Sequence, residues 1–253
     1  MERKLTIITG ANGQVGSFLA RIYSESRTPL LLLYHKKTDR IIDLEEMPGV
    51  TLKSCDLCDA GQVMQVIDCA SRDNSAVPAY LIHTAAVRSS DAKSVAEGDP
   101  DTFANVFRQN LMGTYNILRY TLPAMRDNKF GRVVLFGSNV VNTGLANGAA
   151  YASAKAAIVN LCRSAALENA AHGILINCIS PAPVDTKLEE DYQGEYLAFR
   201  RRYFEKALKL SPTGKLVSKE EIRMVTDLLL SDSLTNLNGE NIVLDGGFSA
   251  QIS

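Results

Sequence analysis

The chain has 253 residues, and its 27 basic side chains nearly balance its 28 acidic ones, which leaves a formal net charge of -1. This balance excludes a nucleic-acid-binding protein that works through bulk positive charge. With 46% hydrophobic and 22% charged residues, the composition also excludes extensive disorder and fibrous repeats. The N-terminus lacks a signal-peptide pattern and no apolar run reaches about 18 residues, so we expect a soluble, cytoplasmic protein that binds no membrane.

Short apolar runs alternate with longer amphipathic stretches along the chain, a pattern typical of repeated strand-helix units. Most of these runs are continuously apolar, as expected of parallel strands that helices cover on both faces. We therefore predict an α/β fold with a single Rossmann-type doubly wound domain over residues 1–253 and a seven-stranded parallel sheet. The expected strands are Leu5–Thr9, Leu30–Tyr34, Val50–Cys55, Ala79–His83, Arg132–Gly137, Leu175–Ile179 and Asn241–Leu244.

Five cysteines in a chain without an export signal are expected to be reduced thiols. Cys55 and Cys58 form a C-x-x-C pair, but no second Cys or His pair follows at the spacing of a zinc site. We therefore expect no metal site.

The first expected strand runs directly into a glycine-rich segment that opens a helical pattern. Glycines allow the backbone to approach a pyrophosphate, and the free N–H groups at the helix start, with the helix dipole, bind its negative charge. The segment therefore predicts a dinucleotide site. Its expected cofactor-binding residues are Gly10, Asn12, Gly13, Gln14, Val15 and Gly16.

The ends of the next two strands bear on which nucleotide is bound. Lys36 and Lys37 follow the second strand, and no acid appears before Asp39. A basic pair here favours NADP(H), whose 2'-phosphate it would bind, although the lysines would equally suit a solvated loop and NAD(H) stays an alternative. Asp56, followed by Leu57, closes the third strand with an acid suited to an adenine amino group or to a helix cap.

Tyr151 and Lys155 are four residues apart in an expected helix that runs to about Ala171. Residues at this spacing share one helix face, so the phenol and the ammonium lie side by side. A neighbouring cation stabilises the phenolate and lowers the pKa of the tyrosine. Such a tyrosine can exchange a proton with an alcohol or carbonyl oxygen near neutral pH.

The pair does not stand alone. Ser138 precedes Tyr151 by thirteen residues, Asn110 precedes Leu111-Met112-Gly113-Thr114, and Pro181 opens a Pro-Ala-Pro-Val-Asp-Thr segment after the sixth expected strand. Together with the glycine turn and the ending Asn238–Gly247, these motifs make the chain similar, over essentially its whole length, to the short-chain dehydrogenase/reductase family.

The resemblance implies a role for each matching position. Tyr151 would be the general acid in carbonyl reduction and the base in alcohol oxidation, and Lys155 would lower its pKa and hold the nicotinamide ribose. Ser138 would orient the substrate oxygen, unless it serves only as a helix or turn cap, and Asn110 would anchor a water relay that reaches Lys155. The further cofactor contacts implied by the resemblance are Thr84, Ala85, Pro181, Val184 and Thr186.

Two features depart from the shorter branch of the family that the chain length matches. The glycines Gly10, Gly13 and Gly16 have the spacing of the extended branch, and His83-Thr84-Ala85-Ala86 resembles that branch's His-x-Ala-Ala. This hybrid character keeps a sugar or polyol substrate in consideration.

In this fold a segment beyond the strand ends covers the substrate, and the irregular stretch at about 186–210 is the expected lid. Its aromatic residues would supply walls. Arg200, Arg201 and Arg202 suggest recognition of an anion, but consecutive residues spread around a helix, so at most one or two can face the cleft. The same charges would also complement a helix dipole without any ligand.

These observations predict an NADP(H)-dependent oxidoreductase that transfers hydride between nicotinamide and a carbonyl or secondary alcohol, of 3-oxoacyl or general ketone reductase type. A sugar or polyol dehydrogenase and an NAD-retaining sugar epimerase are alternatives. A non-catalytic NAD(P)-binding sensor is disfavoured because all four motif residues, Asn110, Ser138, Tyr151 and Lys155, are present. The expected partners are a small-molecule substrate and further copies of the chain, in a homotetramer or dimer.

Overall fold

The computed structural model describes residues 3–27, 29–88 and 91–251. Within these residues seven strands form one sheet in the order β3-β2-β1-β4-β5-β6-β7, and every neighbouring pair is parallel. The predicted fold class is therefore confirmed. The strands are β1 (Arg3–Thr9), β2 (Leu30–Tyr34), β3 (Val50–Ser54), β4 (Ala76–His83), β5 (Gly131–Phe136), β6 (Ile174–Pro181) and β7 (Asn241–Leu244).

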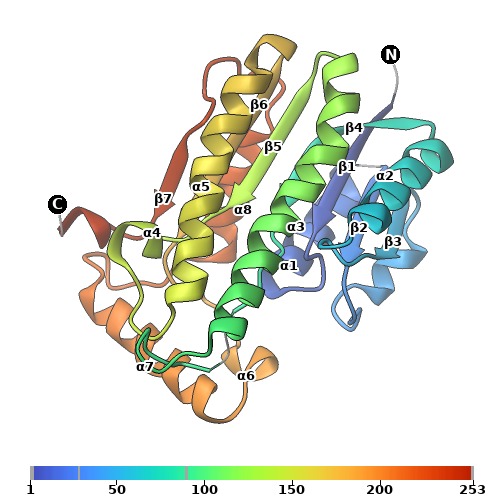
Figure 1. The fold of residues 1–253 in the computed structure, drawn as a ribbon. Helices are drawn as coiled ribbons and strands as arrows, with labels where there is room; N and C mark the ends of the chain where they lie inside the picture. The colour runs from blue at the N-terminus through green and yellow to red at the C-terminus, as the bar shows by residue number, and fades with distance from the viewer. Residues whose placement is uncertain (1–2, 28, 89–90, 252–253) are drawn as a thin grey trace.

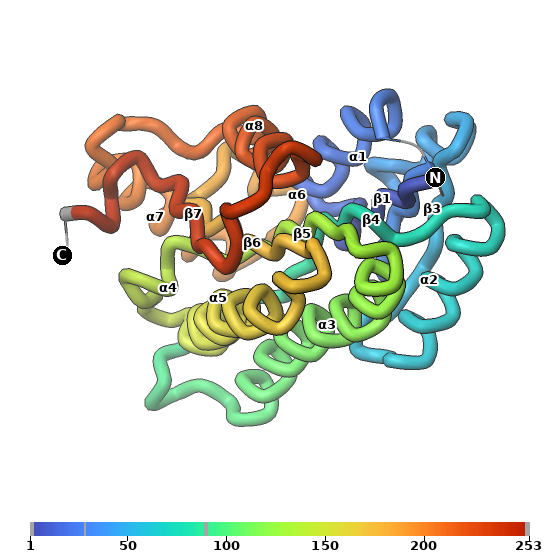
Figure 2. Tube along the Cα trace, turned by 90° about the horizontal axis from the view of Figure 1, so that it is seen from above, coloured from blue at the N-terminus to red at the C-terminus, as the bar shows by residue number. Residues whose placement is uncertain are grey.

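Helices cover both faces of the sheet (Figure 1; Figure 2). One face carries α2 (Ala60–Asn74), α3 (Pro100–Asp127) and α5 (Ala149–Asn169), and the other carries α1 (Gln14–Ser26) and α8 (Lys219–Leu229). One further long helix is α7 (Gly194–Leu210). The shorter elements are α4 (Val140–Thr143), α6 (Leu188–Asp191) and the 3-10 turns at Ile42–Glu46, Ala170–His172 and Ser249–Gln251.

The alternation of side chains along each strand explains why the strands read as continuous apolar runs. In β2, Leu31 and Leu33 join the core beneath α2, α3 and α5, whereas Leu30 and Leu32 join the core beneath α1 and α8. All four side chains are at most 1% exposed. Because successive residues point to opposite faces, a strand buried on both sides is apolar at most of its positions.

The expectation of an irregular segment after β6 was wrong for most of its length. Residues 188–191 and 194–210 are helical, and α6 and α7 lie beyond the carboxyl ends of the strands, at the bottom of Figure 1. Aromatic residues at positions 196, 199 and 203 of α7 recur at helical spacing, a pattern that the dense charges of the segment obscure. Over the described ranges, no helix is both long and apolar enough to cross a membrane.

Candidate active site

The glycine turn between β1 and α1 is shaped for close approach of a phosphate. Gly10 has a positive φ of 64°, and a Cβ on Gly16 would collide with the Gly10 carbonyl oxygen, so side chains are excluded from both positions. Gly13 caps α1 without a side-chain hydrogen bond, and the first turn holds no acid. The helix start therefore offers unblocked N–H groups to an anion, and the residues fit the pyrophosphate of a dinucleotide.

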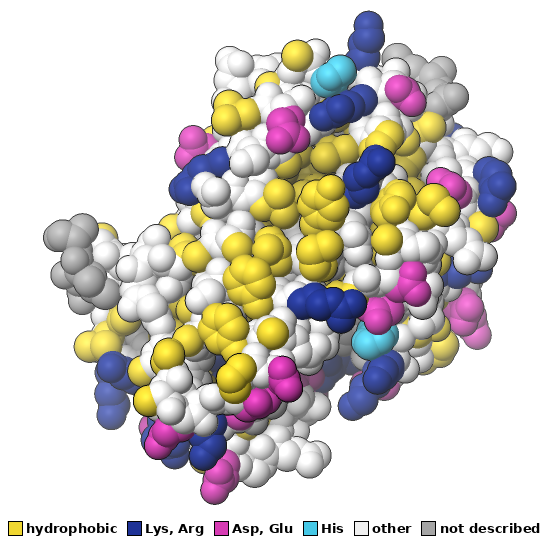
Figure 3. Space-filling view, in the orientation of Figure 1, with side chains coloured by type: hydrophobic (Ala, Val, Ile, Leu, Met, Phe, Trp, Pro, Cys, Tyr) yellow, Lys and Arg dark blue, Asp and Glu magenta, His cyan; other side chains and the backbone are white. Residues whose placement is uncertain are grey.

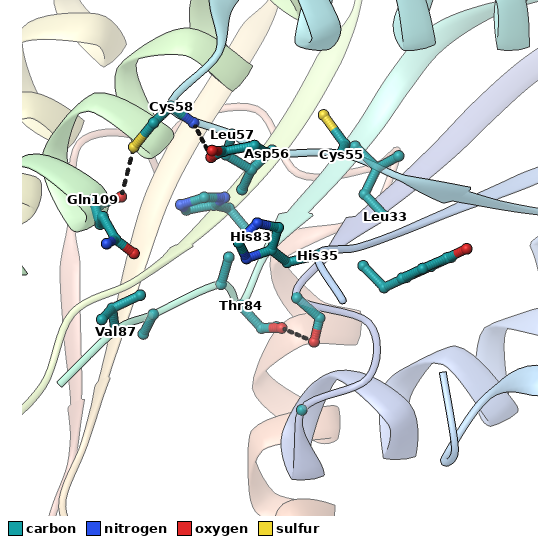
Figure 4. A pocket seen from close by; sticks show the side chains of 15 residues that line it. Leu33, His35, Cys55, Asp56, Leu57, Cys58, His83, Thr84, Val87 and Gln109 are labelled. Atoms are coloured by element: carbon teal, nitrogen blue, oxygen red, sulfur yellow. Dashed lines mark hydrogen bonds between the residues drawn. The ribbon is translucent and has the colours of Figure 1, made fainter. Parts of the chain in front are cut away.

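A cavity of about 330 Å³ opens beside this turn. It brings together six of the predicted cofactor residues and adds His35, which the sequence analysis did not select (Figure 4). The Asp56 carboxylate accepts from the Cys58 backbone N–H, and α2 is capped by Asp59, so Asp56 is not the cap of that helix. The predicted residues that line the cavity are Gly10, Gly13, Asp56, Leu57, Thr84 and Ala85.

The predicted readers of the 2'-phosphate, Lys36 and Lys37, are exposed and do not line this cavity. Asn12, predicted to bind cofactor, instead holds the loop that follows them: its Oδ1 accepts from the Arg40 backbone N–H at 2.9 Å, and its Nδ2 donates to Asp39 at 3.0 Å. The glycine turn and the loop after β2 are thus joined through one amide.

A second cavity, of about 240 Å³, adjoins the first and shares Gly13, Thr84 and Ala86 with it. Tyr151 and Ser138 lie in its wall, so the structure places the predicted proton donor and the predicted substrate-orienting serine next to the phosphate-binding turn. The other predicted residues that line it are Gln14, Val15, Gly16, Pro181, Val184 and Thr186.

Tyr151 is 6% exposed and lies among cations. Burial by itself would raise the pKa of Tyr151, but the charges of Arg88, Lys155 and Arg200 and a hydrogen bond with Ser138 outweigh it, so the pKa of the phenol falls below its ordinary value. The Arg88 guanidinium carbon lies 4.3 Å from the centre of the phenol ring. The site therefore favours the phenolate more than the Tyr-Lys pair alone would.

Lys155 is 2% exposed and lines neither cavity. Its Nζ lies 5.7 Å from the centre of the Tyr151 ring and donates to the Phe136 carbonyl oxygen at 2.6 Å. Burial lowers the pKa of Lys155, against the opposing effect of Tyr151. This lysine is held at the end of β5, one helical turn beyond the tyrosine.

Asn110, buried on α3 as predicted, holds the loop after β4. Its Oδ1 accepts from the Val87 N–H at 3.1 Å, while its Nδ2 donates to the carbonyl oxygens of Val87 at 2.8 Å and Val106 at 2.7 Å. The amide thus fixes the residue immediately before Arg88. A water relay from Asn110 to Lys155 stays a prediction.

Sequence reasoning missed Arg88 and Arg40. Arg88 follows the end of β4 by five residues, and this position at the carboxyl edge of a parallel sheet was the available signal. Arg40 bonds Glu190 at 3.0 Å and Asp191 at 2.8 Å. Together with the hydrogen bond from Gln14 Nε2 to Asp191, at 2.8 Å, these pairs join α6 to the phosphate-binding turn.

His83, at the end of β4, is 2% exposed and bridges two threonines. The Thr114 hydroxyl donates to the Asn110 carbonyl oxygen, so it accepts from His83 Nε2 at 2.9 Å, and His83 Nδ1 accepts from the Thr9 hydroxyl at 2.7 Å. Burial, assisted by the charge of Lys155, lowers the pKa of His83 to about 3. The imidazole is therefore neutral at physiological pH.

A protein-family model described as enoyl-(acyl carrier protein) reductase matches residues 10–249. The chain belongs to the short-chain dehydrogenase/reductase family and is an oxidoreductase. It is 26% identical over 266 aligned residues to an uncharacterized oxidoreductase, YxjF, of Bacillus subtilis, with 99% of this chain and 100% of that protein covered.

Solved structures agree on the fold. Levodione reductase superposes with a TM-score of 0.86 at 24% identity, covering 99% of both chains. NADP-bound ElxO gives 0.83 at 23% identity, covering 99% of this chain and 100% of ElxO. NAD+-bound xylitol dehydrogenase gives 0.82 at 23% identity, covering 97% of this chain and 99% of that one. At these identities the likeness establishes the architecture alone.

The neutral, buried imidazole of His83 makes stability depend on pH. The unfolded chain binds a proton near pH 6.5 and the folded chain only near pH 3, so stability is full above pH 6.5 and is lost as the pH falls toward 3. At about 1.4 kcal/mol per pH unit, the wild-type free energy of unfolding should fall by about 3 kcal/mol more than that of His83→Gln between pH 6.5 and pH 4. Urea titrations at each pH measure this difference.

His172→Gln is the matched control, because His172 is exposed. Its pH dependence should follow that of the wild type. Equal slopes for the wild type and His83→Gln would contradict the assignment of a neutral imidazole.

Proposed function

We propose that the protein is an NADP(H)-dependent oxidoreductase that transfers hydride between nicotinamide and a carbonyl or secondary alcohol, with Tyr151 as its general acid and base. The observation that carries this proposal is the position of Tyr151, which is buried among three cations in a cavity continuous with the phosphate-binding turn. The type we favour is a 3-oxoacyl or general ketone reductase.

A bound nicotinamide would supply or accept the hydride. In reduction, the Tyr151 hydroxyl donates its proton to the substrate oxygen, and the resulting phenolate is stabilised by the neighbouring cations. In oxidation, the same phenolate accepts the alcohol proton. Ser138, which lies beside the Tyr151 hydroxyl in the same cavity, orients the substrate oxygen.

Lys155 supports the tyrosine and does not itself exchange the substrate proton. Its ammonium is held by the Phe136 carbonyl and lies beneath the cavity wall, where it stabilises negative charge on the phenol. Ribose hydroxyls of the cofactor are its proposed partners, and Asn110 completes the set as the anchor of the adjoining loop.

We propose NADP(H) as the preferred cofactor because the loop after β2 carries two exposed lysines, Lys36 and Lys37. The similar solved structures differ in the cofactor that they hold, since ElxO is seen with NADP and xylitol dehydrogenase with NAD+. Residues 186–210 are the proposed substrate lid of a single domain, and their links to Gln14 and Arg40 support this role.

Assembly into a homo-oligomer is proposed from the outer face of α3 and α5. Figure 3 shows hydrophobic side chains gathered over these two helices. Tyr115 is 47% and Met112 is 41% exposed there, and Leu122 and Leu161 line a shallow depression between the helices. An apolar patch of this kind on a solvent-exposed face favours association with a second copy of the chain.

Replacing the proton donor should stop the reaction without emptying the site. Tyr151→Phe should lower kcat for ketone reduction by about 10³-fold or more, because general acid-base catalysis is lost, while cofactor affinity stays within about threefold. Absorbance of NADPH at 340 nm follows turnover, and calorimetric titration measures binding. Wild-type turnover by Tyr151→Phe would remove the tyrosine from the mechanism.

The basic pair should discriminate between cofactors. The double variant Lys36→Gln, Lys37→Gln should weaken NADPH binding by about tenfold or more through loss of charge-assisted contacts, and change NADH binding by less than about twofold. The double variant Lys206→Gln, Lys209→Gln removes the same charge from exposed positions of α7 and serves as control. Equal loss for both cofactors would refute recognition of the 2'-phosphate, and unchanged binding of both would assign the lysines to a solvated loop.

The exposed face of α3 should hold copies together. Tyr115→Glu places a charge on the proposed interface and should shift the sedimentation coefficient toward that of a 27.5 kDa monomer. Met64→Glu, on the outer face of α2 where Met64 is 46% exposed, should leave it unchanged. A wild-type monomer would refute the proposed association.

A further inference from the structure

The catalytic cleft holds more positive charge than its proposed chemistry requires. Arg88 and Arg200 both line the cavity that contains Tyr151. Among the described residues, neither arginine forms an ion pair with a carboxylate. The one acid that lines the cavity, Asp191, is already bound by Arg40 and Gln14. Two guanidinium groups are therefore left unpaired in a largely enclosed space.

Arg200 is the more unusual of the two. It is 4% exposed, and its Nε has no hydrogen-bond partner in the described part of the chain. Its guanidinium carbon lies 5.6 Å from the ring centre of Tyr192, 5.5 Å from that of Tyr203 and 5.0 Å from that of Phe204. Aromatic faces stabilise the cation only in part, and a buried charge without a counter-charge is costly to keep.

Its two neighbours in the sequence behave differently. Arg201 is exposed and pairs with Glu189 at 2.6 Å, and Arg202 is exposed and lines a neighbouring cavity that does not contain Tyr151. Of the three consecutive arginines only Arg200 enters the cleft, in agreement with the helical spread expected from the sequence. Arg201 and Arg202 already give the surface of α7 its positive charge, so a role in surface charge does not explain why Arg200 is buried.

Arg88 reaches the same cavity from the loop after β4. Its guanidinium lies over the Tyr151 ring and contacts the Tyr192 hydroxyl. The preceding residue, Val87, is held by the Asn110 amide through both its N–H and its carbonyl group, so the backbone that carries Arg88 is firmly positioned. The two arginines therefore converge from the loop after β4 and from α7 on the volume beside the reacting tyrosine.

We propose that the substrate of this enzyme carries an oxyanion, a carboxylate or a phosphate, within a few carbon atoms of its reacting carbonyl or alcohol, and that Arg88 and Arg200 bind this group. The inference rests on the proposed function and specifies its substrate class. Planar guanidinium groups match the geometry of carboxylate and phosphate oxygens, and binding would supply the missing counter-charge for Arg200. The cavity of about 240 Å³ must also admit the nicotinamide, so only the part of the substrate that carries the reacting group and the oxyanion fits beside Tyr151.

Neither the phosphates of the cofactor nor an acidic carrier protein accounts for these arginines equally well. The pyrophosphate belongs at the N-terminus of α1, whereas Arg88 lies over the phenol ring. A carrier protein would contact exposed side chains such as Arg202, whereas Arg200 is enclosed. A small anionic molecule inside the cleft satisfies both observations.

The test compares matched anionic and neutral ketones. The pairs are 4-oxocyclohexanecarboxylate with its methyl ester, levulinate with its methyl ester, and dihydroxyacetone phosphate with dihydroxyacetone. For the wild type, kcat/KM should favour the anion of at least one pair by tenfold or more. The pair that shows this preference identifies the oxyanion as carboxylate or phosphate.

The variants Arg200→Met and Arg88→Met should each lower kcat/KM for the preferred anion by about 100-fold, mainly through KM, and change that of its neutral partner by less than threefold. Arg202→Met removes the same charge from an exposed position of α7 outside the cavity that contains Tyr151, and it should behave like the wild type. Two arginines are tested because the buried Arg200→Met variant could fail to fold. In that case the Arg88→Met variant still tests the inference.

Two results would overturn the inference. One is equal kcat/KM for the anionic and neutral members of every pair. The other is an equal loss for both members in each arginine variant, with the pH profile of the neutral ketone shifted to higher pH, because the arginines would then act only on the pKa of Tyr151.

Binding without turnover separates this inference from the proposed function. Calorimetric titration of the protein with NADP+ bound would use cyclohexanecarboxylate, cyclohexylmethanol and inorganic phosphate as probes. Binding of an anion that depends on Arg200 supports the oxyanion site even if no ketone is reduced, in which case only the proposed function fails. Turnover of neutral ketones with no arginine-dependent binding of either anion refutes the oxyanion site and leaves the function standing.

Discussion

The hydrogen bond from the buried Lys155 ammonium to the Phe136 carbonyl oxygen, 2.6 Å long, ties α5 to the carboxyl end of β5. A charged group that is 2% exposed must recover its lost hydration from specific partners, and a backbone carbonyl at a strand end is a rigid one. Once this contact forms, the position of the helix along the sheet is set. Tyr151, one turn earlier, is then presented to the cleft, and the electrostatics of the site follow from its position.

The cleft concentrates cations around one phenol. Arg88, Lys155 and Arg200 come from the loop after β4, from α5 and from α7, so no local segment of the chain contains the site. Each of them disfavours the others, and burial disfavours all three; the charge of Arg88 adds to burial in lowering the pKa of Arg200. The fold therefore tolerates an unfavourable charge arrangement at the place where negative charge would develop during proton transfer, as is common at catalytic sites.

Much of the architecture could be predicted from local patterns. The seven apolar runs and the glycine turn are determined by neighbours in the sequence, and the strand bounds at β2 and β7 agree with the prediction to the residue. The Tyr151 and Lys155 pair was equally accessible, because helical spacing places both side chains on one face. Motif residues that act within one or two turns of the chain leave a readable signal.

The partners contributed across the fold could not be predicted in the same way. Arg88 and Arg200 are 112 positions apart, and only the sheet topology brings them to one cavity. The helical nature of residues 194–210 was hidden because α7 packs aromatic and charged side chains over a cleft, with only Arg200 fully buried. Arg40 was overlooked because its partners, Glu190 and Asp191, lie far along the chain.

The side-chain amide of Asn110 bonds both the N–H and the carbonyl group of Val87, so α3 fixes the position of the loop after β4. A defect introduced at Asn110 would be transmitted through a single peptide linkage to the guanidinium above Tyr151. Impaired turnover in such a mutant would thus combine a displaced loop with any direct part of the amide in proton movement. The kinetics of Asn110 variants can be interpreted only alongside the same measurements on Arg88 variants, because Asn110 holds the backbone that positions Arg88.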